Sequence, residues 1–428
     1  MNDRIKTTPY WWEFCAPRVL GDSPPATTDV VVIGGGYTGL NAALSLRRGG
    51  ASVTVLEAAA FGDGASTRNA GHVSSGVNLG KGSSSAVRSP MERDLPPETL
   101  AAVRQEAAAS FDFLEDRVAE LPQQALYHRS GRFVGAVSPR HYRALEAKAA
   151  RLGGRLVPRA QQRNEIGTDL YHGGMVIDRS GQLHPARYLH GLADLALAEG
   201  VALSSRTPAL SIDRRPGGWI VSTPDHRIVC DRVLVATNGY SGPLLPWLRR
   251  RVIPAASYIV VTEDLGEGML DRLLPKRRTV ADTRRLLNYY RPTPDGRRLL
   301  FGGRATLRPR DPALVGQELM QRVRRIFPDL SDARAAHAWT GTIAFTFDFM
   351  PHLGERDGIV HALGCNGSGV AMLSYLGHRA AQAILGQDQS AFWNLRFPTV
   401  PFYRETPWFL PMMSGYQRSL DWVDRLRG

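Results

Sequence analysis

The sequence predicts an α/β protein in which a parallel-sheet domain is joined to a second domain of antiparallel strands. Three observations lead to this fold class. A β-branched strand, a glycine turn and a helix follow one another between Asp29 and Glu57. Strand-like segments with aromatic residues recur through residues 255–345, and a second strand, glycine loop and helix occupy residues 358–385. A chain of 428 residues is also too long for one compact unit.

The segment from Asp29 to Glu57 has every part of a dinucleotide-binding βαβ unit. Residues 30–33 are typical of a strand buried on both faces, the helix is expected to end at Arg48, and residues 52–56 form the second strand. We expect Glu57 to accept both hydroxyls of an adenosine ribose. Because its carboxylate would repel a 2′-phosphate, NADP is disfavoured, and NAD and FAD both remain open for this unit.

Glycines at the start of the helix each have a specific role. Gly34 permits the tight turn, Gly36 lets the backbone approach a pyrophosphate, and Gly39 lets the helix pack close to the strand. The free N–H groups of the helix N-terminus suit phosphates. The residues predicted to bind the nucleotide here are Gly34, Gly36, Tyr37, Thr38, Gly39 and Glu57.

Composition excludes several classes of protein. The three cysteines lie far apart without metal-ligand spacing, so neither a disulfide framework nor a metal site is expected. The net charge of +13 comes almost entirely from scattered arginines, which favours a solvated surface over a nucleic-acid stripe. No apolar stretch approaches the roughly 18 residues of a membrane span, and no secretory signal is evident, so a cytoplasmic location is expected.

The chain between the glycine loops is expected to alternate between helices and short strands. Residues 1–25 have no periodic pattern and predict an irregular arm laid across the surface. The predicted helices cover 98–121, 139–152, 185–199 and 312–327. The predicted strands cover parts of 127–137, then 201–203, a β-meander at 209–213, 219–222 and 226–229, a buried strand at 232–235, and antiparallel strands at 256–262, 287–291, 299–303 and 337–345.

A second strand, glycine loop and helix junction decides between the two cofactors. Residues 358–363 predict a strand, and the loop 364–369 opens a helix that ends near Leu385. NAD needs one such helix start for its pyrophosphate. FAD can use the first for its pyrophosphate and the second for the flavin pyrimidine edge, where reduction builds negative charge. The sequence therefore favours FAD.

With these motifs in view, the chain resembles the D-amino-acid-oxidase-like flavoenzymes of the glutathione-reductase type, and most closely the gamma-glutamylputrescine oxidase family. The resemblance covers nearly the whole chain. Its anchors are Tyr10-Trp11, Val-Ile-Gly-Gly-Gly-Tyr-Thr-Gly-Leu at 32–40, Gly-Ala-Ser-Thr-Arg-Asn-Ala-Gly at 64–71, Leu183-His184-Pro185, Ala-Thr-Asn-Gly-Tyr at 236–240, Leu-Phe-Gly-Gly-Arg at 300–304, Trp339-Thr340-Gly341, residues 348–354 and Gly-Cys-Asn-Gly-Ser-Gly-Val at 364–370.

The resemblance implies a discontinuous Rossmann-like FAD-binding domain and an antiparallel-sheet α+β substrate domain that covers the flavin. The expected division is an N-terminal arm at 1–25, the FAD-binding domain at 26–90, 174–250 and 335–390, the substrate domain at 91–173 and 251–334, and a C-terminal arm at 391–428. Further cofactor contacts are then expected at Ala65, Ser66, Arg68, Asn69, Ala236, Asn238, Gly239, Met350, Pro351, Gly367, Ser368, Gly369 and Val370.

The resemblance also implies oxidation of an amine such as gamma-glutamylputrescine or a similar polyamine derivative. A C–H next to nitrogen transfers a hydride to flavin N5, the imine hydrolyses, and oxygen or another acceptor reoxidises the flavin. The candidate catalytic residues are Tyr258, Tyr290, Arg291, Trp339 and Ser368, with Tyr289 as a further contact. For the candidates on strands, ordinary sheet packing is the alternative. The family often has histidine where Ser368 stands.

Two features set this chain apart from related sarcosine oxidases. The stretch from Trp339 to Phe349 has no cysteine to tether a flavin, so FAD is expected to be non-covalent. No lysine falls on the expected roof strands to assist oxygen, which leaves Arg291 or Arg304 as cationic substitutes.

Two other functions remain open at the level of sequence. An amino-acid or N-methylglycine oxidase or dehydrogenase would place an arginine against the substrate carboxylate. A basic flavoprotein that binds RNA or an acidic partner is supported by the charge alone, so nucleic acid is not an expected partner. The sequence leaves the oligomeric state undetermined.

Overall fold

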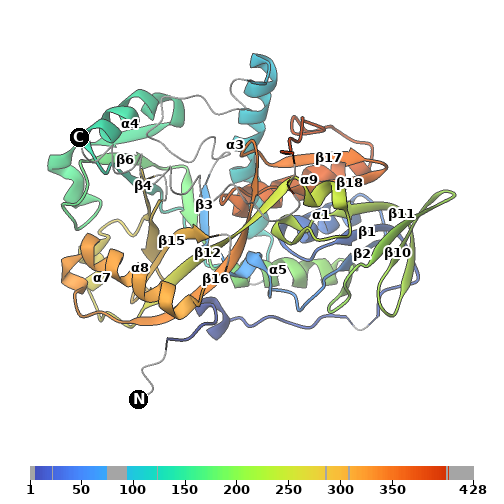
Figure 1. Ribbon diagram of the computed structural model, residues 1–428, viewed down its shortest axis with the longest axis horizontal. Coiled ribbons are helices and arrows are strands. Elements are labelled where there is room, and N and C mark those ends of the chain that lie inside the picture. The colour runs from blue at the N-terminus through green and yellow to red at the C-terminus, as the bar shows by residue number, and fades with distance from the viewer. Residues whose placement is uncertain are drawn as a thin grey trace.

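Residues 5–21, 23–74, 94–122, 124–284, 287–306, 309–401 and 403 are described by the computed structural model, apart from the side chains of Arg151, Arg304 and Ala305. Two large sheets stand side by side, and helices pack around them (Figure 1). The predicted fold class is confirmed. Within the described residues, no helix has both the length and the apolar character needed to cross a membrane.

The first sheet is a mostly parallel sheet with the order β17-β18-β11-β1-β2-β8. Its strands are β1 (Thr27–Ile33), β2 (Val53–Leu56), β8 (Ala202–Ser204), β11 (Arg227–Val235), β17 (His352–Arg356) and β18 (Ile359–Leu363), and β9 (Ser211–Arg215) and β10 (Gly218–Ser222) extend it from β11. Strands β8, β2, β1, β11 and β18 run parallel, whereas β17 pairs antiparallel with β18. Both predicted glycine loops therefore leave one parallel sheet, after β1 and β18.

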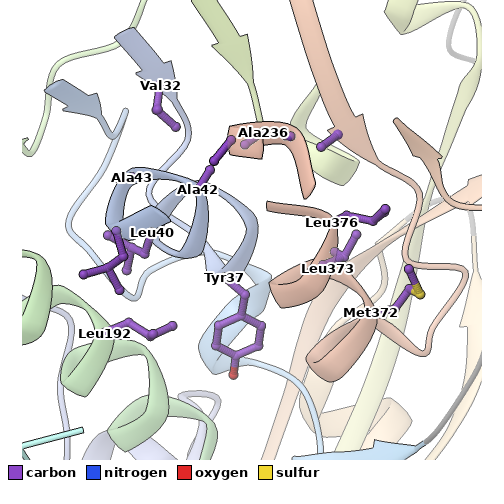
Figure 2. Packing of buried hydrophobic residues seen from close by; sticks show 14 of the residues in the cluster. Val32, Tyr37, Leu40, Ala42, Ala43, Leu192, Ala236, Met372, Leu373 and Leu376 are labelled. Atoms are coloured by element: carbon purple, nitrogen blue, oxygen red, sulfur yellow. The ribbon is translucent and has the colours of Figure 1, made fainter. Parts of the chain in front are cut away.

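The helices of this part pack closely against one another and the sheet. They are α1 (Tyr37–Arg48), α3 (Pro97–Ala119), α5 (Pro185–Ala198) and α9 (Gly369–Ile384). Figure 2 shows apolar side chains of α1, α5 and α9 meeting in one core, among them Leu40, Leu192 and Leu376. Helices α1 and α9 cross where a Cβ on Gly377 would lie 2.1 Å from the Thr38 carbonyl oxygen.

The second sheet has eight strands in the order β16-β12-β15-β14-β13-β4-β6-β5. Its strands are β4 (Arg132–Gly135), β5 (Gly154–Val157), β6 (Gly174–Ile177), β12 (Val252–Thr262), β13 (Thr279–Asp282), β14 (Tyr289–Pro292), β15 (Leu299–Thr306) and β16 (Ala335–Thr346). All pairs are antiparallel except β13 with β4. Figure 1 shows α7 (Met269–Leu273) and α8 (Pro312–Ile326) on the side away from the first sheet, and α4 (Pro139–Leu152) beside β6.

A small sheet of β3 (His72–Ser74) and β7 (Ser180–Gln182) lies between the two large sheets (Figure 1). The strands are antiparallel, and His72 pairs with Gln182. Gln182 also bridges His128, just before β4. This small sheet therefore joins the loop after β2 to the second large sheet.

Three expectations need correction. The segments 226–229 and 232–235 form one strand, β11, because its first half pairs with β10 and its second half with β18. The N-terminal arm does not simply lie across the surface, since Trp11 is fully buried and residues 10–13 form a short 3₁₀ helix. The elements β3, β5, β6, β7, β13, β17, α7 and α6 (Pro246–Arg249) were not predicted.

The membership of the sheets differs from the predicted domain division at two places. The boundaries at 174 and 335 assigned residues of β6 and β16 to the FAD-binding domain, whereas both strands belong to the second sheet. Strand pairing explains their membership of the second sheet. Strand β16 pairs with β12 along its whole length, and β6 lies between β4 and β5. The domain boundaries otherwise stay a prediction, and of the predicted C-terminal arm only the residues up to 401 and Tyr403 are described.

Candidate cofactor and substrate site

The first glycine loop has a backbone that only glycine allows. Gly34 has a φ of +109°, and a Cβ there would lie 2.8 Å from the carbonyl oxygen of Ala236. A Cβ on Gly39 would lie 1.9 Å from the carbonyl oxygen of Gly34. Helix α1 therefore starts close to the ends of β1 and β11, as the roles assigned to these glycines require.

The N-terminus of α1 is open toward the loop that follows β2. Gly36 is the N-cap and provides no side-chain cap, and Tyr37 donates its backbone N–H to Ser66 Oγ at 3.2 Å. A Cβ on Gly36 would lie 2.9 Å from the same oxygen. A helix N-terminus with a bare glycine cap and a facing hydroxyl fits the pyrophosphate of a dinucleotide.

Glu57 ends β2 and holds the glycine loop in place. Its carboxylate accepts the backbone N–H of Gly35 at 2.8 Å and that of Ala59 at 3.1 Å. Burial raises the pKa of the Glu57 carboxyl, and hydrogen bonds from the backbone of Ala59 and Gly35 lower it in part. A carboxylate with four acceptor positions can still accept ribose hydroxyls beside these two bonds.

The second glycine loop is attached to the end of β11. Asn238, with a φ of +45°, accepts the backbone N–H groups of Gly364 and Cys365 at 3.0 and 3.3 Å through its side-chain oxygen. Asn366 holds the other side of the loop, because its side chain bonds Thr346 and the carbonyl of Gly364. Asn238 therefore holds the second glycine loop against the end of β11.

The start of α9 brings several predicted residues together. Ser368 is the N-cap of α9, and its Oγ lies 2.6 Å from Ser74 Oγ at the end of β3. A Cβ on Gly364 would lie 3.0 Å from the Met350 carbonyl oxygen and 3.3 Å from Pro351 Cα. Gly367 precedes α9 with a φ of +74°, and Gly369 and Val370 are the first residues of that helix. Gly239 lies beside Thr342.

The loop after β2 is held by its own side chains and by contacts with Trp11 and with β16. Arg68 donates to the Asp63 carbonyl and to the carbonyl of Thr340 on β16. Asn69 bonds the carbonyls of Ala65 and Ser66, and Trp11 donates to the Asn69 carbonyl at 2.9 Å. Arg68 and Asn69 therefore shape the loop, and the hydroxyl of Ser66 faces α1.

Two of the candidate catalytic tyrosines face away from the glycine loops. The Tyr258 hydroxyl accepts the backbone N–H of Arg310 at 2.7 Å, and the Tyr290 hydroxyl lies 2.9 Å from that of Tyr171. Both side chains belong to the core beneath α8, with Val323. These contacts support a packing role for Tyr258 and Tyr290.

Arg291 and Trp339 lie on the opposite face of the second sheet. They connect this face to the loop after β2 and to Leu183. Arg291 donates to the carbonyls of Leu183 and Gly71 at 2.9 and 3.3 Å, and also to that of Pro292. Trp339 Nε1 donates to the Arg68 carbonyl at 2.9 Å. Both side chains are buried, and these bonds use Nε1 of Trp339 and Nε and Nη1 of Arg291.

The same face carries Tyr289, whose hydroxyl lies 3.3 Å from Ser257 Oγ. Its ring packs edge-on against His72, with centroids 5.7 Å apart. A Cβ on Gly302 would lie 2.1 Å from the Tyr289 ring, so glycine makes room for the tyrosine. Sequence reasoning missed His72, although it directly follows the Gly-Ala-Ser-Thr-Arg-Asn-Ala-Gly motif.

The residues present fit FAD. Two helix N-termini, α1 and α9, open beside adjacent parts of one sheet, with a bare glycine cradle at the first. Among the described residues, no three His, Cys, Asp or Glu side chains form a group that could hold a metal ion.

A family model described as FAD dependent oxidoreductase, DAO, matches residues 29–383. The chain belongs to this family. The match includes both glycine loops, and members of the DAO family bind FAD, so the protein is an FAD-dependent oxidoreductase that acts on amine or amino-acid type substrates.

Individual relatives cover almost the whole chain. A "probable oxidoreductase OrdL" of Rhizobium meliloti (strain 1021) is 32% identical over 405 residues, which is 91% of this chain and 92% of the relative. The gamma-glutamylputrescine oxidoreductase of Escherichia coli (strain K12) is 31% identical over 386 residues, 88% of each chain.

Solved structures share the fold at lower identity. Glycine oxidase from Geobacillus kaustophilus superposes with a TM-score of 0.69 at 20% identity and covers 89% of this chain and 99% of its own. L-proline dehydrogenase from P. horikoshii gives a TM-score of 0.69 at 18% identity over 86% of this chain and 96% of its own. These similarities show the fold.

Proposed function

We propose that the protein oxidises the C–N bond of an amine that carries a polar acyl end, such as gamma-glutamylputrescine or a similar polyamine derivative. The similarity to a gamma-glutamylputrescine oxidoreductase over 88% of each chain supports this choice. The observation that carries it is the hydrogen bonding of Arg291.

Arg291 is the buried arginine on the face of the second sheet that meets the FAD-side loops. Its guanidinium donates to the main-chain carbonyls of Leu183, Gly71 and Pro292. These bonds use Nε and Nη1 and hold the guanidinium against the main chain, so Arg291 presents fewer donors than the two-pronged guanidinium that an α-amino-acid oxidase would direct at the carboxylate beside its reacting carbon. The site therefore favours an amine without a carboxylate next to the oxidised carbon.

The protein side chains bind and orient the amine. FAD, when bound, supplies the acceptor for the hydride that leaves the carbon next to nitrogen. Tyr289 and Ser257 offer hydroxyls on the face of the second sheet that is turned toward the glycine loops. On the same face, Trp339, Ile259 and Leu300 exclude water. Ser368, at the start of α9, stays a proposed contact at the pyrimidine edge.

Several finer expectations belong to this proposal. The three cysteines are free, as suits a reducing cytoplasm. Many arginines pair with carboxylates at the surface, for example Arg48 with Glu199 and Arg310 with Glu318, which supports a solvated surface instead of a nucleic-acid site. Oxygen or another acceptor reoxidises the cofactor.

Anaerobic titration of the purified flavoprotein tests the proposal. We expect gamma-glutamylputrescine to bleach the flavin absorption, and glycine, N-methylglycine and L-proline to leave it unchanged at equal concentration. Bleaching by an amino acid alone would replace the amine with the amino-acid alternative. A flavoprotein that none of these compounds bleaches, with dithionite as a positive control for reduction, would reject both substrate classes.

A further inference from the structure

Arg132, the first residue of β4, is a cation without a counterion. Its Nε is enclosed and has no hydrogen-bond partner, and the guanidinium makes no ion pair with any described residue. Burial alone lowers the pKa of Arg132 to about 10. Arg132 as a whole is half-buried, and because a charge partly withdrawn from water is costly unless it is paired, an anionic ligand would stabilise a guanidinium in this position.

Two more unpaired polar atoms lie in the small sheet beside it. His72 Nε2 on β3 and Gln182 Oε1 on β7 are both enclosed and without a hydrogen-bond partner. His72 and Gln182 are directly paired across the two antiparallel strands, so their side chains share one face. The Gln182 amide nitrogen already donates to the Arg277 carbonyl, which leaves the oxygen as the unpaired acceptor.

The charges around this cluster have one sign. Burial first, and then the charges of Arg132 and Arg291, lower the pKa of His72 well below its usual value. No carboxylate contributes to the pKa of His72, Arg132 or Arg291 among the described residues. Main-chain carbonyls bind Nε and Nη1 of Arg291, whereas Arg132 Nε has no hydrogen-bond partner. The charge of Arg132 therefore has neither a carboxylate nor a main-chain acceptor at Nε among the described residues.

The small sheet that carries His72 and Gln182 contacts both the second large sheet and the start of α9. The His72 ring contacts Tyr289, and Ser74, two residues further along β3, meets Ser368 at the start of α9. Two strand spacings separate β14 from β4 in the second sheet, which is about 10 Å. A group bound at Arg132 would therefore lie about 10 Å along the sheet from the strand of Tyr289, with His72 in contact with the Tyr289 ring.

We propose that Arg132, His72 and Gln182 form a subsite for an α-amino-acid group at the end of the substrate that is not oxidised. In this subsite, Arg132 binds the carboxylate and Gln182 Oε1 accepts an N–H of the ammonium, while His72 closes the space between them. The inference rests on the proposed amine oxidation, because it assigns the far end of the same substrate. It also explains how an acidic end group is recognised although Nε and Nη1 of Arg291 are bonded to the main chain.

Matched acyl derivatives of putrescine test each contact separately. γ-Glutamylputrescine carries both the carboxylate and the ammonium, N-glutarylputrescine lacks the ammonium, and N-(4-aminobutyryl)putrescine lacks the carboxylate. For each compound, binding is measured from perturbation of the flavin absorption and from thermal stabilisation, and reduction is measured anaerobically. The proteins compared are the wild type and the variants Arg132→Met, Arg132→Lys, Gln182→Leu and, as a control, Arg129→Met, because Arg129 is exposed and paired with Glu115.

The wild type is expected to bind γ-glutamylputrescine about 10- to 100-fold more tightly than the 4-aminobutyryl compound, as fits one charge-assisted pair. Arg132→Met should abolish this preference, Arg132→Lys should keep part of it, and Arg129→Met should keep all of it. Gln182→Leu should abolish only the preference for γ-glutamylputrescine over N-glutarylputrescine.

An Arg132→Met protein that retains flavin and still prefers the carboxylated compounds would overturn the subsite. So would an Arg132→Met protein that folds but loses FAD, because the anion at Arg132 would then belong to the cofactor. Binding of γ-glutamylputrescine with the expected preferences but without flavin reduction would reject the proposed oxidation and leave the subsite standing.

Discussion

The side-chain oxygen of Asn238 accepts the backbone N–H groups of both Gly364 and Cys365, at 3.0 and 3.3 Å. Asn238 follows β11, and Gly364 and Cys365 follow β18, the neighbouring parallel strand. One carboxamide thus fixes the glycine loop at the start of α9 relative to the loop that lies against Gly34. Asn238 therefore links the two glycine loops, and we expect this link to matter for cofactor binding.

Replacement of Asn238 should weaken FAD binding without unfolding the protein. Asn238→Gly keeps the backbone at its φ of +45° but leaves two N–H groups without their acceptor. We expect the dissociation constant for FAD to rise by up to about 30-fold, because the two lost bonds together contribute about 2 kcal/mol. Reconstitution of the apoprotein with FAD measures this. Asn238→Asp keeps an acceptor oxygen and serves as the control, and equal affinities for the two variants would contradict the coupling.

Gly377→Ala should separate α1 from α9. Its Cβ would lie 2.1 Å from the Thr38 carbonyl oxygen, which is backbone and cannot rotate away. We expect a loss of about 2 kcal/mol or more in the free energy of unfolding, together with reduced flavin content. Urea unfolding of the holoprotein measures the free energy of unfolding, and the ratio of flavin to protein absorption measures the flavin content. Gly191→Ala in α5 is the matched control, since its Cβ would meet only the flexible Leu121 side chain at 3.1 Å, and an equal loss there would reject the explanation.

The hydrogen bond from Trp339 Nε1 to the Arg68 carbonyl should contribute to stability. Trp339→Phe keeps an aromatic ring in the buried position but leaves the carbonyl without its donor. We expect a loss of about 1–3 kcal/mol in the free energy of unfolding. Trp247→Phe is the comparison, because Trp247 Nε1 is enclosed without a partner and its removal costs no hydrogen bond. A larger loss for Trp247→Phe in thermal unfolding would contradict this account.

Acid should destabilise the fold partly through His361. Burial, together with His352, Arg251 and Arg356, lowers the pKa of His361 from 6.5 to about 3. Below pH 6.5 the unfolded chain therefore binds a proton that the folded chain does not, so the free energy of unfolding falls as the pH falls toward 3.

Between pH 6.5 and 5 this single group accounts for at most about 2 kcal/mol. His361→Gln should flatten the pH dependence of the melting temperature over that range, and the exposed His128→Asn should leave it unchanged. An unchanged slope in His361→Gln would show that His361 is also protonated in the folded state.

FAD should leave the protein on denaturation. Cys365 is the cysteine in the second glycine loop, and its thiol is directed at the Ala344 carbonyl oxygen at 3.7 Å. Cys230 is buried in β11, away from both helix starts. After acid precipitation we expect all of the flavin absorption in the supernatant, and flavin that stays with the pellet would contradict a non-covalent site.

The sequence by itself determined the elements whose signals are local. Gly34 and Gly39 were predicted because a positive φ and a close backbone approach exclude other residues, and the structure shows both conditions. The long helices α3, α5, α8 and α9 were predicted from their apolar periodicity, and the observed ends agree within a few residues. Helix α4, predicted from residue 139, does begin there, and the Ser138 hydroxyl caps it by accepting the His141 N–H.

Tertiary structure alone decided which side chains meet. Tyr289 and Tyr290 are neighbours in sequence and equally aromatic, yet only the sheet pairing turns Tyr290 toward α8 and Tyr289 toward His72. Trp11 is buried because residues far along the chain enclose it. The unpaired atoms of Arg132, His72 and Gln182 come from three separate strands, so no local pattern connects them. A sequence encodes local conformation residue by residue, whereas contacts between distant segments depend on strand order and register, which arise only when the chain has folded.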